Sequence, residues 1–277
     1  MTATLADPNT LSDAQFRAIS TLVKSICGID LHDGKKELVK ARLAKRIRLL
    51  RLRTFDEYIT FVRDDAGGNE LTTMLDSLST NLTFFFRETM HFDYLQSHAI
   101  PRLMEQRKSQ RRLRLWSAGC STGEEPYSLA MMLLEHFPEL RTWDVRILAT
   151  DLSTRVLAQA REGAYDAGRV RQVPAPLAAR YFVPDAQRER FRVCDEVRSK
   201  IAFARLNLME PWPMRGPFDV IFCRNVMIYF DKPTQETLVR RFHGLLPPGG
   251  LLMVGHSESL TGIAHTFHYV RPAVYEK

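Results

Sequence analysis

Residues 113–125 read LRLWSAGCSTGEE, in which a short apolar run is followed by small residues and then by two glutamates. The apolar run predicts a β-strand, and the acidic pair predicts the start of a helix. The glycines between them let the backbone approach a ligand closely. The loop lacks a full G-x-G-x-x-G motif, and Glu124 and Glu125 stand where a pyrophosphate would need unshielded amides. Taken alone, the loop is also compatible with a plain structural turn.

The chain from residue 113 onward alternates short apolar runs with helical stretches. Such alternation is typical of a parallel sheet with crossover helices, and several runs are apolar throughout, as expected of strands covered on both faces. The expected fold class is therefore α/β, with a Rossmann-like domain. The expected strands are Leu113–Ala118, Val145–Thr150, Ile201–Leu206, Phe218–Arg224 and Gly250–Gly255, with a closing pair at residues 267–270 and 273–275, and the expected helices are Glu125–Phe137, Ser153–Glu162 and Thr234–Leu246.

The first third of the chain is predicted to be helical. Apolar residues recur there at helical spacing, and Ser12 is a suitable N-cap for the first helix. We therefore expect a small all-α domain at residues 1–85, followed by the α/β domain at residues 86–277. The expected helices start near Ala14, run from about Lys35 to Leu52, and cover Phe55–Arg63 and Leu71–Leu78.

A small antiparallel β insert is expected within the second domain, at about residues 180–200. Its strands are predicted at residues 181–183, 191–194 and 197–200, because these runs are too short and too closely spaced for a strand–helix–strand unit. The turn between the first two runs, from Val183 to Arg190, contains no glycine.

Composition and charge limit the class of protein. With 277 residues, 45% of them hydrophobic and 26% charged, the chain is expected to fold into two domains. The four cysteines lack the spacing of a zinc site or a disulfide scaffold, which predicts reduced thiols, a cytoplasmic location and no bound metal. Residues 1–10 do not resemble a secretory signal, and no apolar run is long enough to cross a membrane. The net charge of +7 favours an acidic partner, which nucleic acid, an anionic membrane or an acidic protein would each satisfy.

Polar side chains follow the ends of the predicted strands, where ligands bind in open parallel sheets. Asp151 follows the second strand and can accept both hydroxyls of a ribose, although it is equally suited to cap the next helix. Asn207 and Leu208 follow the third strand and offer an amide and an apolar side chain to a base, or they form a surface turn. Arg224 and Asn225 follow the fourth strand. This series favours a nucleoside ligand without phosphate, namely S-adenosylmethionine, over a dinucleotide.

Five motifs stand in a fixed order along the chain. They are Thr80–Glu88 (TNLTFFFRE), Ser117–Ser128 (SAGCSTGEEPYS), Asn207-Leu208, Phe222–Asp231 (FCRNVMIYFD) and Gly255–Ser259 (GHSES). Together they resemble the CheR family of chemotaxis receptor glutamate methyltransferases, and the resemblance covers nearly the whole chain. It implies transfer of a methyl group from S-adenosylmethionine to glutamate side chains on the cytoplasmic helices of methyl-accepting chemotaxis receptors, with S-adenosylhomocysteine as the product.

The resemblance also implies a role for each matching residue. Asn81, Thr83 and Arg87 would lie along the cofactor. Arg87 would bind the methionine carboxylate through its planar guanidinium, unless it only pairs with Glu88. Glu125 would bind the methionine ammonium. The other assignments are Gly119 in the cofactor loop, Asp151 for the ribose, Asn207 and Leu208 for the adenine, and Arg224 and Asn225 beside the sulfonium.

Arg87, Arg224 and Tyr229 are the expected catalytic residues. An unperturbed glutamate has a pKa near ~4.3, so the substrate carboxylate is already ionised at neutral pH and no general base is needed. Arg224 and Tyr229 would orient this carboxylate, although aromatic packing is the alternative role for Tyr229.

The second predicted helix carries a line of cations beside an apolar stripe that should pack inward. The family resemblance makes this line a docking surface for the acidic receptor helices, where charge alone would suggest a solvated face. The cations are Lys35, Arg42, Arg46 and Arg53, and the apolar stripe is Val39, Leu43, Ile47 and Leu50.

Two other functions are compatible with the sequence. A nucleic-acid methyltransferase would bind phosphates with the basic helix, but residues 224–227 lack the Asn/Asp-Pro-Pro-Tyr/Phe motif of many such enzymes. A non-catalytic sensor would bind the cofactor without transferring its methyl group. We expect neither, and we expect a monomer that binds no nucleic acid and does not insert into a membrane. Some members of the family grip a peptide tether at the receptor's C-terminus with a glycine-containing loop, so the glycine-free turn predicts activity without a tether.

Overall fold

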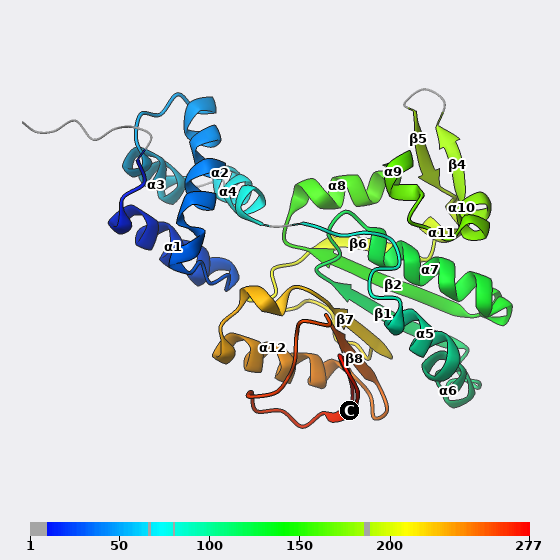
Figure 1. Cartoon of the computed structure of the whole chain (residues 1–277). Helices are drawn as coiled ribbons and strands as arrows, with labels where there is room; N and C mark the ends of the chain where they lie inside the picture. The colour runs from blue at the N-terminus through cyan, green and yellow to red at the C-terminus, as the bar shows by residue number, and fades with distance from the viewer. Residues whose placement is uncertain (1–9, 66–67, 80, 186–188) are drawn as a thin grey trace, which may run out of the picture. The chain divides into compact units, whose positions relative to one another are not determined.

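The computed structural model describes residues 10–65, 68–79, 81–185 and 189–277. By its internal contacts the chain forms two compact units, and Figure 1 labels most of their helices and strands. The helical unit comprises the described residues up to 79 together with Tyr229–Asp231. The sheet unit comprises Asn81–Ile228 and Lys232–Lys277.

The helical unit consists of amphipathic helices, and the predicted helices are confirmed with small shifts at their ends. Helix α1 begins with a capping box, in which the side chains of Ser12 and Gln15 each bond the other's backbone N–H. The elements are α1 (Asp13–Cys27), the 3-10 turn η1 (Asp33–Lys35), α2 (Lys36–Leu49), α3 (Phe55–Asp64) and α4 (Asn69–Leu78).

The sheet unit contains a seven-stranded sheet in the order β6-β2-β1-β7-β8-β10-β9. The strands from β6 to β8 are parallel, and β10 runs antiparallel to both β8 and β9. The strand order reverses between β1 and β7, and this is the position where open α/β sheets bind ligands. The strands are β1 (Arg112–Ala118), β2 (Asp144–Asp151), β6 (Ile201–Arg205), β7 (Val220–Cys223), β8 (Leu251–Val254), β9 (His268–Arg271) and β10 (Val274–Glu276).

Helices cover both faces of this sheet. Leu115 and Trp116 are consecutive in β1 and therefore face opposite sides. Leu115 lies in the same buried cluster as Leu129 of α7, whereas the Trp116 ring centre is 5.3 Å from that of Phe242 in α12. These layers confirm the predicted Rossmann-like α/β fold. The helices are α5 (Met90–Tyr94), α6 (Ile100–Gln106), α7 (Glu124–His136), α8 (Thr154–Glu162) and α12 (Lys232–Leu245), with shorter turns at η2 (Leu95–Ala99), η3 (Pro138–Thr142) and η4 (Met227–Tyr229).

The small antiparallel insert is present, but one of its strands was predicted wrongly. Its three strands lie in the order β3-β5-β4, and residues 195–198 form a helical turn where the third strand was expected. Asp195 and Glu196 favour a helix N-terminus at that point. The third strand is β3, which immediately follows the left-handed Gly163 at the end of α8. The elements are β3 (Ala164–Asp166), α9 (Ala167–Val170), α10 (Ala175–Tyr181), β4 (Phe182–Asp185), β5 (Arg190–Val193) and α11 (Asp195–Arg198).

Part of the turn used to predict tether independence, residues 186–188, lies outside the described residues. Among the helices that the structure describes, none combines the length and the apolar character that crossing a membrane would require.

Candidate functional site

The loop after β1 is fixed by hydrogen bonds to β2. The N–H groups of Gly119 and Cys120 both donate to the Thr150 carbonyl, at 2.8 and 2.9 Å. Gly119 has a φ of 87°, and a Cβ atom there would lie 2.4 Å from Cγ2 of Val226. Glycine is required at this position because the loops that follow β1 and β7 approach each other so closely.

Asp151 joins this loop to the end of β2. Its Oδ2 accepts a hydrogen bond from the Ser121 N–H at 2.8 Å, and its Oδ1 accepts one from the Ser153 N–H at 2.9 Å. The helix cap of α8 is Ser153, whose hydroxyl accepts from the backbone, so the structure does not support the capping alternative for Asp151. The Asp151 carboxylate thus lies at the carboxyl edge of the sheet.

Asn207 and Leu208 follow β6, and both are buried. The Asn207 amide makes hydrogen bonds within its own turn: its Oδ1 accepts from the Met209 N–H at 3.0 Å, and its Nδ2 donates to Glu210 at 3.1 Å. The turn that was the alternative interpretation is therefore present. Contact of these residues with an adenine stays a prediction.

The segment from Asn81 to Glu88 follows an unusual path. Phe86 and Glu88 have φ values of 54° and 58°, which residues other than glycine rarely adopt. The Asn81 carbonyl accepts from the Ser121 hydroxyl at 3.0 Å, and the Phe86 N–H donates to the Ser128 hydroxyl at 2.9 Å. These bonds hold the segment against the loop after β1 and the first turns of α7.

Arg87 has donors that none of the described residues uses. Its Nη1 donates to the Leu82 carbonyl at 2.8 Å, its guanidinium lies 5.6 Å from the Phe84 ring centre, and its Nε is 4.0 Å from Glu88. Among the described residues, the bond to Leu82 is the one hydrogen bond of this guanidinium, so several N–H groups are left for a ligand. Thr83 is half-buried in the same segment.

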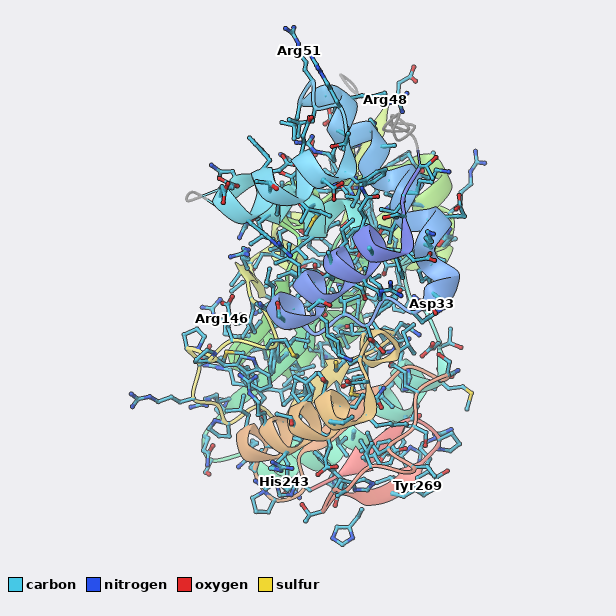
Figure 2. The ribbon with its side chains drawn as sticks, turned by 90° about the vertical axis from the view of Figure 1, so that its left-hand side faces the viewer. Asp33, Arg48, Arg51, Arg146, His243 and Tyr269 are labelled. Atoms are coloured by element: carbon cyan, nitrogen blue, oxygen red, sulfur yellow. The ribbon has the colours of Figure 1, made fainter. Side chains whose placement is uncertain are left out.

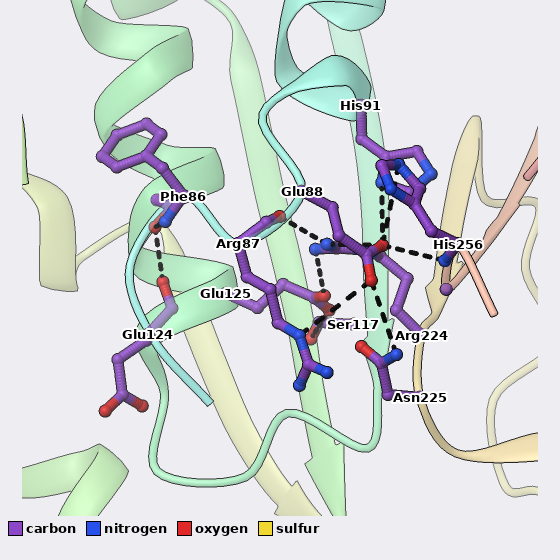
Figure 3. Close-up of polar contacts among 12 residues, drawn as sticks. Phe86, Arg87, Glu88, His91, Ser117, Glu124, Glu125, Arg224, Asn225 and His256 are labelled. Carbon is purple, nitrogen blue, oxygen red and sulfur yellow. Dashed lines mark hydrogen bonds and ion pairs between the residues drawn. The ribbon is translucent and has the colours of Figure 1, made fainter. Parts of the chain in front are cut away.

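Arg224 is the centre of a buried charge cluster (Figure 3), and only 2% of its side chain is exposed. Its Nη1 donates to Glu125 at 2.9 Å, and its Nη2 donates to Glu88 at 3.0 Å and also to the Arg87 carbonyl. The second oxygen of Glu125 accepts from the Ser117 hydroxyl at 2.7 Å. Within these three residues one guanidinium faces two carboxylates, which leaves one negative charge in excess; the Arg87 guanidinium, 4.0 Å from Glu88, offsets it in part until a ligand engages Arg87. Glu88, Glu125 and Arg224 are called the Arg224 cluster below.

The protonation states of this region follow from burial and from Arg224. Burial acts to raise the pKa of Glu88, but the charge and the hydrogen bond of Arg224 outweigh it and lower that pKa, so Glu88 is ionised at neutral pH. Burial and then the positive charge of Arg224 lower the pKa of His91 to about 3, so its ring is neutral.

Glu258 fixes the turns that follow β7 and β8. Its Oε2 accepts from the N–H groups of Gly255 and Asn225 at 2.6 and 2.7 Å, and its Oε1 accepts from that of Ile228 at 3.1 Å. Burial raises the pKa of Glu258 in spite of these donors. Asn225 has a φ of 58°, and its amide nitrogen is 3.5 Å from Glu88. Glu258 therefore positions Asn225 beside the Arg224 cluster.

The structure brings several predicted site residues together within the sheet unit. Arg87, Glu125, Arg224 and Asn225 gather around Glu88. Tyr229 belongs to the helical unit, where its carbonyl accepts from the Asp30 N–H at 2.8 Å, so its catalytic role stays a prediction. No role was assigned from sequence to Glu88, Ser117 or Glu258, although all three lie inside the motifs that carried the family resemblance.

Two of the four predicted docking cations are used inside the helical unit. Arg46 bonds both oxygens of the buried Glu70, at 3.0 and 2.5 Å, and the Tyr58 hydroxyl donates to the same carboxylate at 2.8 Å. Arg42 donates to two carbonyls at the end of α4, at 2.7 and 3.1 Å. These two side chains are not free, contrary to the expectation of one continuous line of cations, because α4 packs beside α2.

The other two predicted docking cations differ from each other in exposure. Lys35 is half-buried, and Arg53 is exposed. The Arg51 side chain, just past the end of α2, extends clear of the ribbon (Figure 2). Within the predicted apolar stripe, Val39, Leu43 and Ile47 are buried, whereas Leu50 is half-buried because the helix has ended. A helical wheel alone does not distinguish cations that bond within the helical unit from cations that face solvent.

Two family models match the chain almost end to end. The all-alpha domain of CheR methyltransferases matches residues 14–79, and their SAM binding domain matches residues 81–275. The chain belongs to the CheR methyltransferase family. Its cofactor is therefore S-adenosylmethionine, as the sequence predicted.

Relatives within the CheR family cover nearly the whole chain. A probable chemotaxis protein methyltransferase of Rhizobium etli is 45% identical over 257 residues, which are 92% of this chain and 96% of that protein. Chemotaxis protein methyltransferases of Borreliella burgdorferi and Escherichia coli are 41% and 40% identical, over 94% and 96% of this chain and 93% and 91% of theirs.

The donor set of this CheR methyltransferase fits S-adenosylmethionine, which carries a carboxylate, an ammonium and a sulfonium. Arg87 has uncommitted donors for the carboxylate. The excess negative charge of the Arg224 cluster suits the two cationic groups. The Nε of Arg224 is buried and has no hydrogen-bond partner among the described residues, so it too offers a donor to a ligand oxygen.

Proposed function

We propose that this CheR methyltransferase esterifies glutamate side chains on the cytoplasmic helices of chemotaxis receptors, with S-adenosylhomocysteine as the second product. Its relatives in three organisms are named as chemotaxis protein methyltransferases at 40% identity or more. The proposal includes a cytoplasmic location, where these receptor helices lie.

The observation that carries the proposal is the Arg224 cluster, with Arg87 beside it. When bound, the cofactor supplies a methyl group on a positively charged sulfur. Glu125 would bind the ammonium and Arg87 the carboxylate of its methionine part. Asn81, Thr83 and Gly119 would line it, Asp151 would bind the ribose, and Asn207 and Leu208 would bind the adenine.

Arg224 and Asn225 would act near the sulfonium in different ways. Arg224 already bonds Glu88, Glu125 and the Arg87 carbonyl, so we infer that it is chiefly a positioning residue, with its Nε as the donor that remains. Asn225 has its main chain held by Glu258 and presents its amide at the same place.

No residue of the protein needs to remove a proton, because a substrate glutamate is ionised at neutral pH. The tasks of the site are then alignment of the carboxylate with the methyl group and exclusion of water. We propose Tyr229 as an orienting residue for the incoming carboxylate, as the family motif implies.

Docking of the acidic receptor helices is proposed for the basic side of α2. Lys35 and Arg53 are the predicted cations suited to this role, whereas Arg42 and Arg46 also stabilise the helical unit. Reversing Arg53 to Glu should lower receptor methylation and leave cofactor binding unchanged. Equal methylation by this variant would show that the side is merely solvated. Arg46→Glu is a poor test, because it would leave Glu70 buried against a second carboxylate.

The decisive experiment is incubation with tritiated S-adenosylmethionine and receptor-containing membranes, followed by mild alkali. Carboxyl methyl esters release volatile methanol, whereas N-methyl groups stay bound to the protein. Label that resists alkali, or that appears on added nucleic acid, would contradict the proposal, and cofactor binding without any transfer would indicate a sensor. A receptor shortened at its C-terminus should be methylated at an unchanged rate if no tether is used.

A further inference from the structure

Three side chains converge beside the Arg224 cluster: Glu88, His91 and His256 (Figure 3). His91 comes from α5 and His256 from the loop after β8, so segments far apart in the chain supply them. One ligand atom from each residue lies within 4.8 Å of the other two. Two imidazoles and one carboxylate are a ligand set typical of first-row transition metals, zinc above all.

His91 is the unusual member of this trio. Its side chain is 1% exposed, yet neither ring nitrogen has a hydrogen bond of good geometry to any described residue. Glu88 Oε2 is 3.5 Å from its Nδ1, and the Ala273 backbone contributes a weak hydrogen bond to the ring, as a carbonyl behind a metal-bound imidazole would. Buried polar groups are nearly always satisfied, so an unsatisfied imidazole that faces a carboxylate points to a missing ligand.

The distances are close to those that a metal requires. Zinc bonds of ~2.0–2.2 Å in a tetrahedral arrangement place the donor atoms about 3.4 Å apart. The His91 Nδ1 to Glu88 Oε2 distance is 3.5 Å, and the His256 Nε2 to Glu88 Oε2 distance is 3.9 Å. The His256 side chain is 38% exposed, so a small rotation closes the remaining gap without moving the core.

The backbone hydrogen bond of His256 does not require a histidine. Its backbone N–H already donates to Glu88 at 3.1 Å, and any residue except proline could supply that bond. The His256 imidazole is turned toward the Glu88 carboxylate, and its ring centre lies 4.9 Å from that of His91. The backbone hydrogen bond does not explain this orientation. The excess negative charge of the Arg224 cluster also favours a cation at this place.

We propose that Glu88, His91 and His256 form a binding site for a divalent transition metal ion, with zinc as the best match and water as the fourth ligand. This proposal departs from the sequence-based expectation of no bound metal: Glu88 and His91 are three residues apart, but the third ligand, His256, comes from a distant segment of the chain. Glu88 also bonds Arg224. A metal ion bound to Glu88 would therefore compete with Arg224 for this carboxylate and disturb the Arg224 cluster beside the proposed cofactor site. Zinc and the cofactor therefore weaken each other's binding, by the same factor in both directions.

The metal site is tested by titrating zinc chloride into the full chain, without an affinity tag, in competition with a chromophoric chelator. His256→Ala is the informative variant, because this side chain is partly exposed and its loss should not disturb folding. His268→Ala is the control, since His268 is an exposed histidine of the edge strand β9. We expect one zinc per chain, a tenfold or greater loss of affinity in His256→Ala, and no change in His268→Ala.

Equal affinity of His256→Ala and the unchanged protein, or no zinc binding by either, would overturn the proposal. Cobalt gives a second readout that does not depend on affinity, because Co²⁺ in a tetrahedral site produces visible absorption bands that are much stronger than those of the hydrated ion. These bands should appear in the unchanged protein and in His268→Ala and should be absent in His256→Ala. Bands that persist in a Cys194→Ser background exclude the half-buried thiol as a ligand, and bands lost with that thiol would count against the site.

The coupling to the cofactor is tested separately, by isothermal titration with S-adenosylmethionine. Saturating zinc should raise the Kd for the cofactor severalfold in the unchanged protein and have no effect in His256→Ala. A Kd that is insensitive to zinc in a protein shown to bind it would overturn the coupling.

Discussion

Replacement of Arg224 by methionine should destabilise the sheet unit strongly. Methionine keeps an unbranched apolar side chain but removes the charge that faces Glu88 and Glu125, whose side chains are only 14% and 13% exposed. Breaking a buried ion pair by deleting one partner typically costs about 3–5 kcal/mol, because the other charge stays buried without compensation. Here two carboxylates lose their partner, so we expect a value within or above that range.

The measurement is urea unfolding followed by tryptophan fluorescence. All three tryptophans, Trp116, Trp143 and Trp212, lie in the sheet unit, so the signal reports on that unit and not on the helical one. The control is Arg146→Met, because the Arg146 side chain is 62% exposed and its loss should change stability by no more than about 0.5 kcal/mol.

A second substitution distinguishes charge from packing. Adding Glu88→Gln to Arg224→Met removes one of the two uncompensated carboxylates, so the double variant should be more stable than the sum of the single changes predicts, by about 1–3 kcal/mol. A loss below about 1 kcal/mol in Arg224→Met, or additive single and double variants, would refute the idea that Arg224 holds these carboxylates.

The remaining predictions concern the ligand, the helical unit and the thiols. Arg87→Ala should weaken cofactor binding about 10- to 150-fold in isothermal titration, which corresponds to the loss of one charged hydrogen bond. The thermal melting temperature should change little, and an unchanged affinity would exclude Arg87 from the site. Arg46→Ala should destabilise the helical unit by about 3 kcal/mol, because the buried Glu70 carboxylate loses its ion-pair partner. Proteolysis of that unit should be faster than in the control variant Lys45→Ala, which changes an exposed side chain. Cys194 should react first with a thiol reagent, since burial raises the pKa of the other three thiols; labelling of all four at one rate would contradict this burial.

The hydrophobic periodicity of the sequence was sufficient to predict most of the fold, because buried parallel strands and amphipathic helices each produce a characteristic local pattern of apolar residues. It failed where pairing is long-range. Strand β3 has only three residues, Ala164–Asp166, and it is a strand because it pairs with β5 some 25 residues later in the chain. Residues 197–200 contain only one apolar residue, Val197, and the acidic start of α11 at Asp195 and Glu196 favours a helical turn there.

Residues of the site were predicted at the strand ends because parallel strands deliver their carboxyl ends to one edge of the sheet. Their partners were not predictable in the same way. A helical wheel shows which face Arg42 and Arg46 occupy, but it does not show that α4 packs against that face. Likewise the position of Arg224 after β7 indicates proximity to a ligand, and its bonds to Glu88 and Glu125 emerge only when three separate segments fold together.

The adjacent residues Glu124 and Glu125 are chemically identical but bind different partners in the structure. Glu124 is fully buried and pairs with Arg169 of α9 at 2.5 Å, although burial still raises its pKa. Glu125 is about 100° further around α7 and therefore reaches Arg224. Arg169 also lies 3.9 Å from Asp166, which is largely exposed, whereas Arg224 is shared between two largely buried carboxylates, Glu125 and Glu88.

Under the proposed function, the excess negative charge of the Arg224 cluster would favour a sulfonium over a pyrophosphate at the loop after β1. At an effective dielectric constant of about 20, a unit charge about 5 Å away contributes about 3 kcal/mol. That contribution is favourable for an ammonium or a sulfonium and unfavourable for each phosphate charge of a dinucleotide. A Rossmann-like sheet offers the same strand ends to either ligand, so the selection rests on a second carboxylate that Arg224 alone does not neutralise.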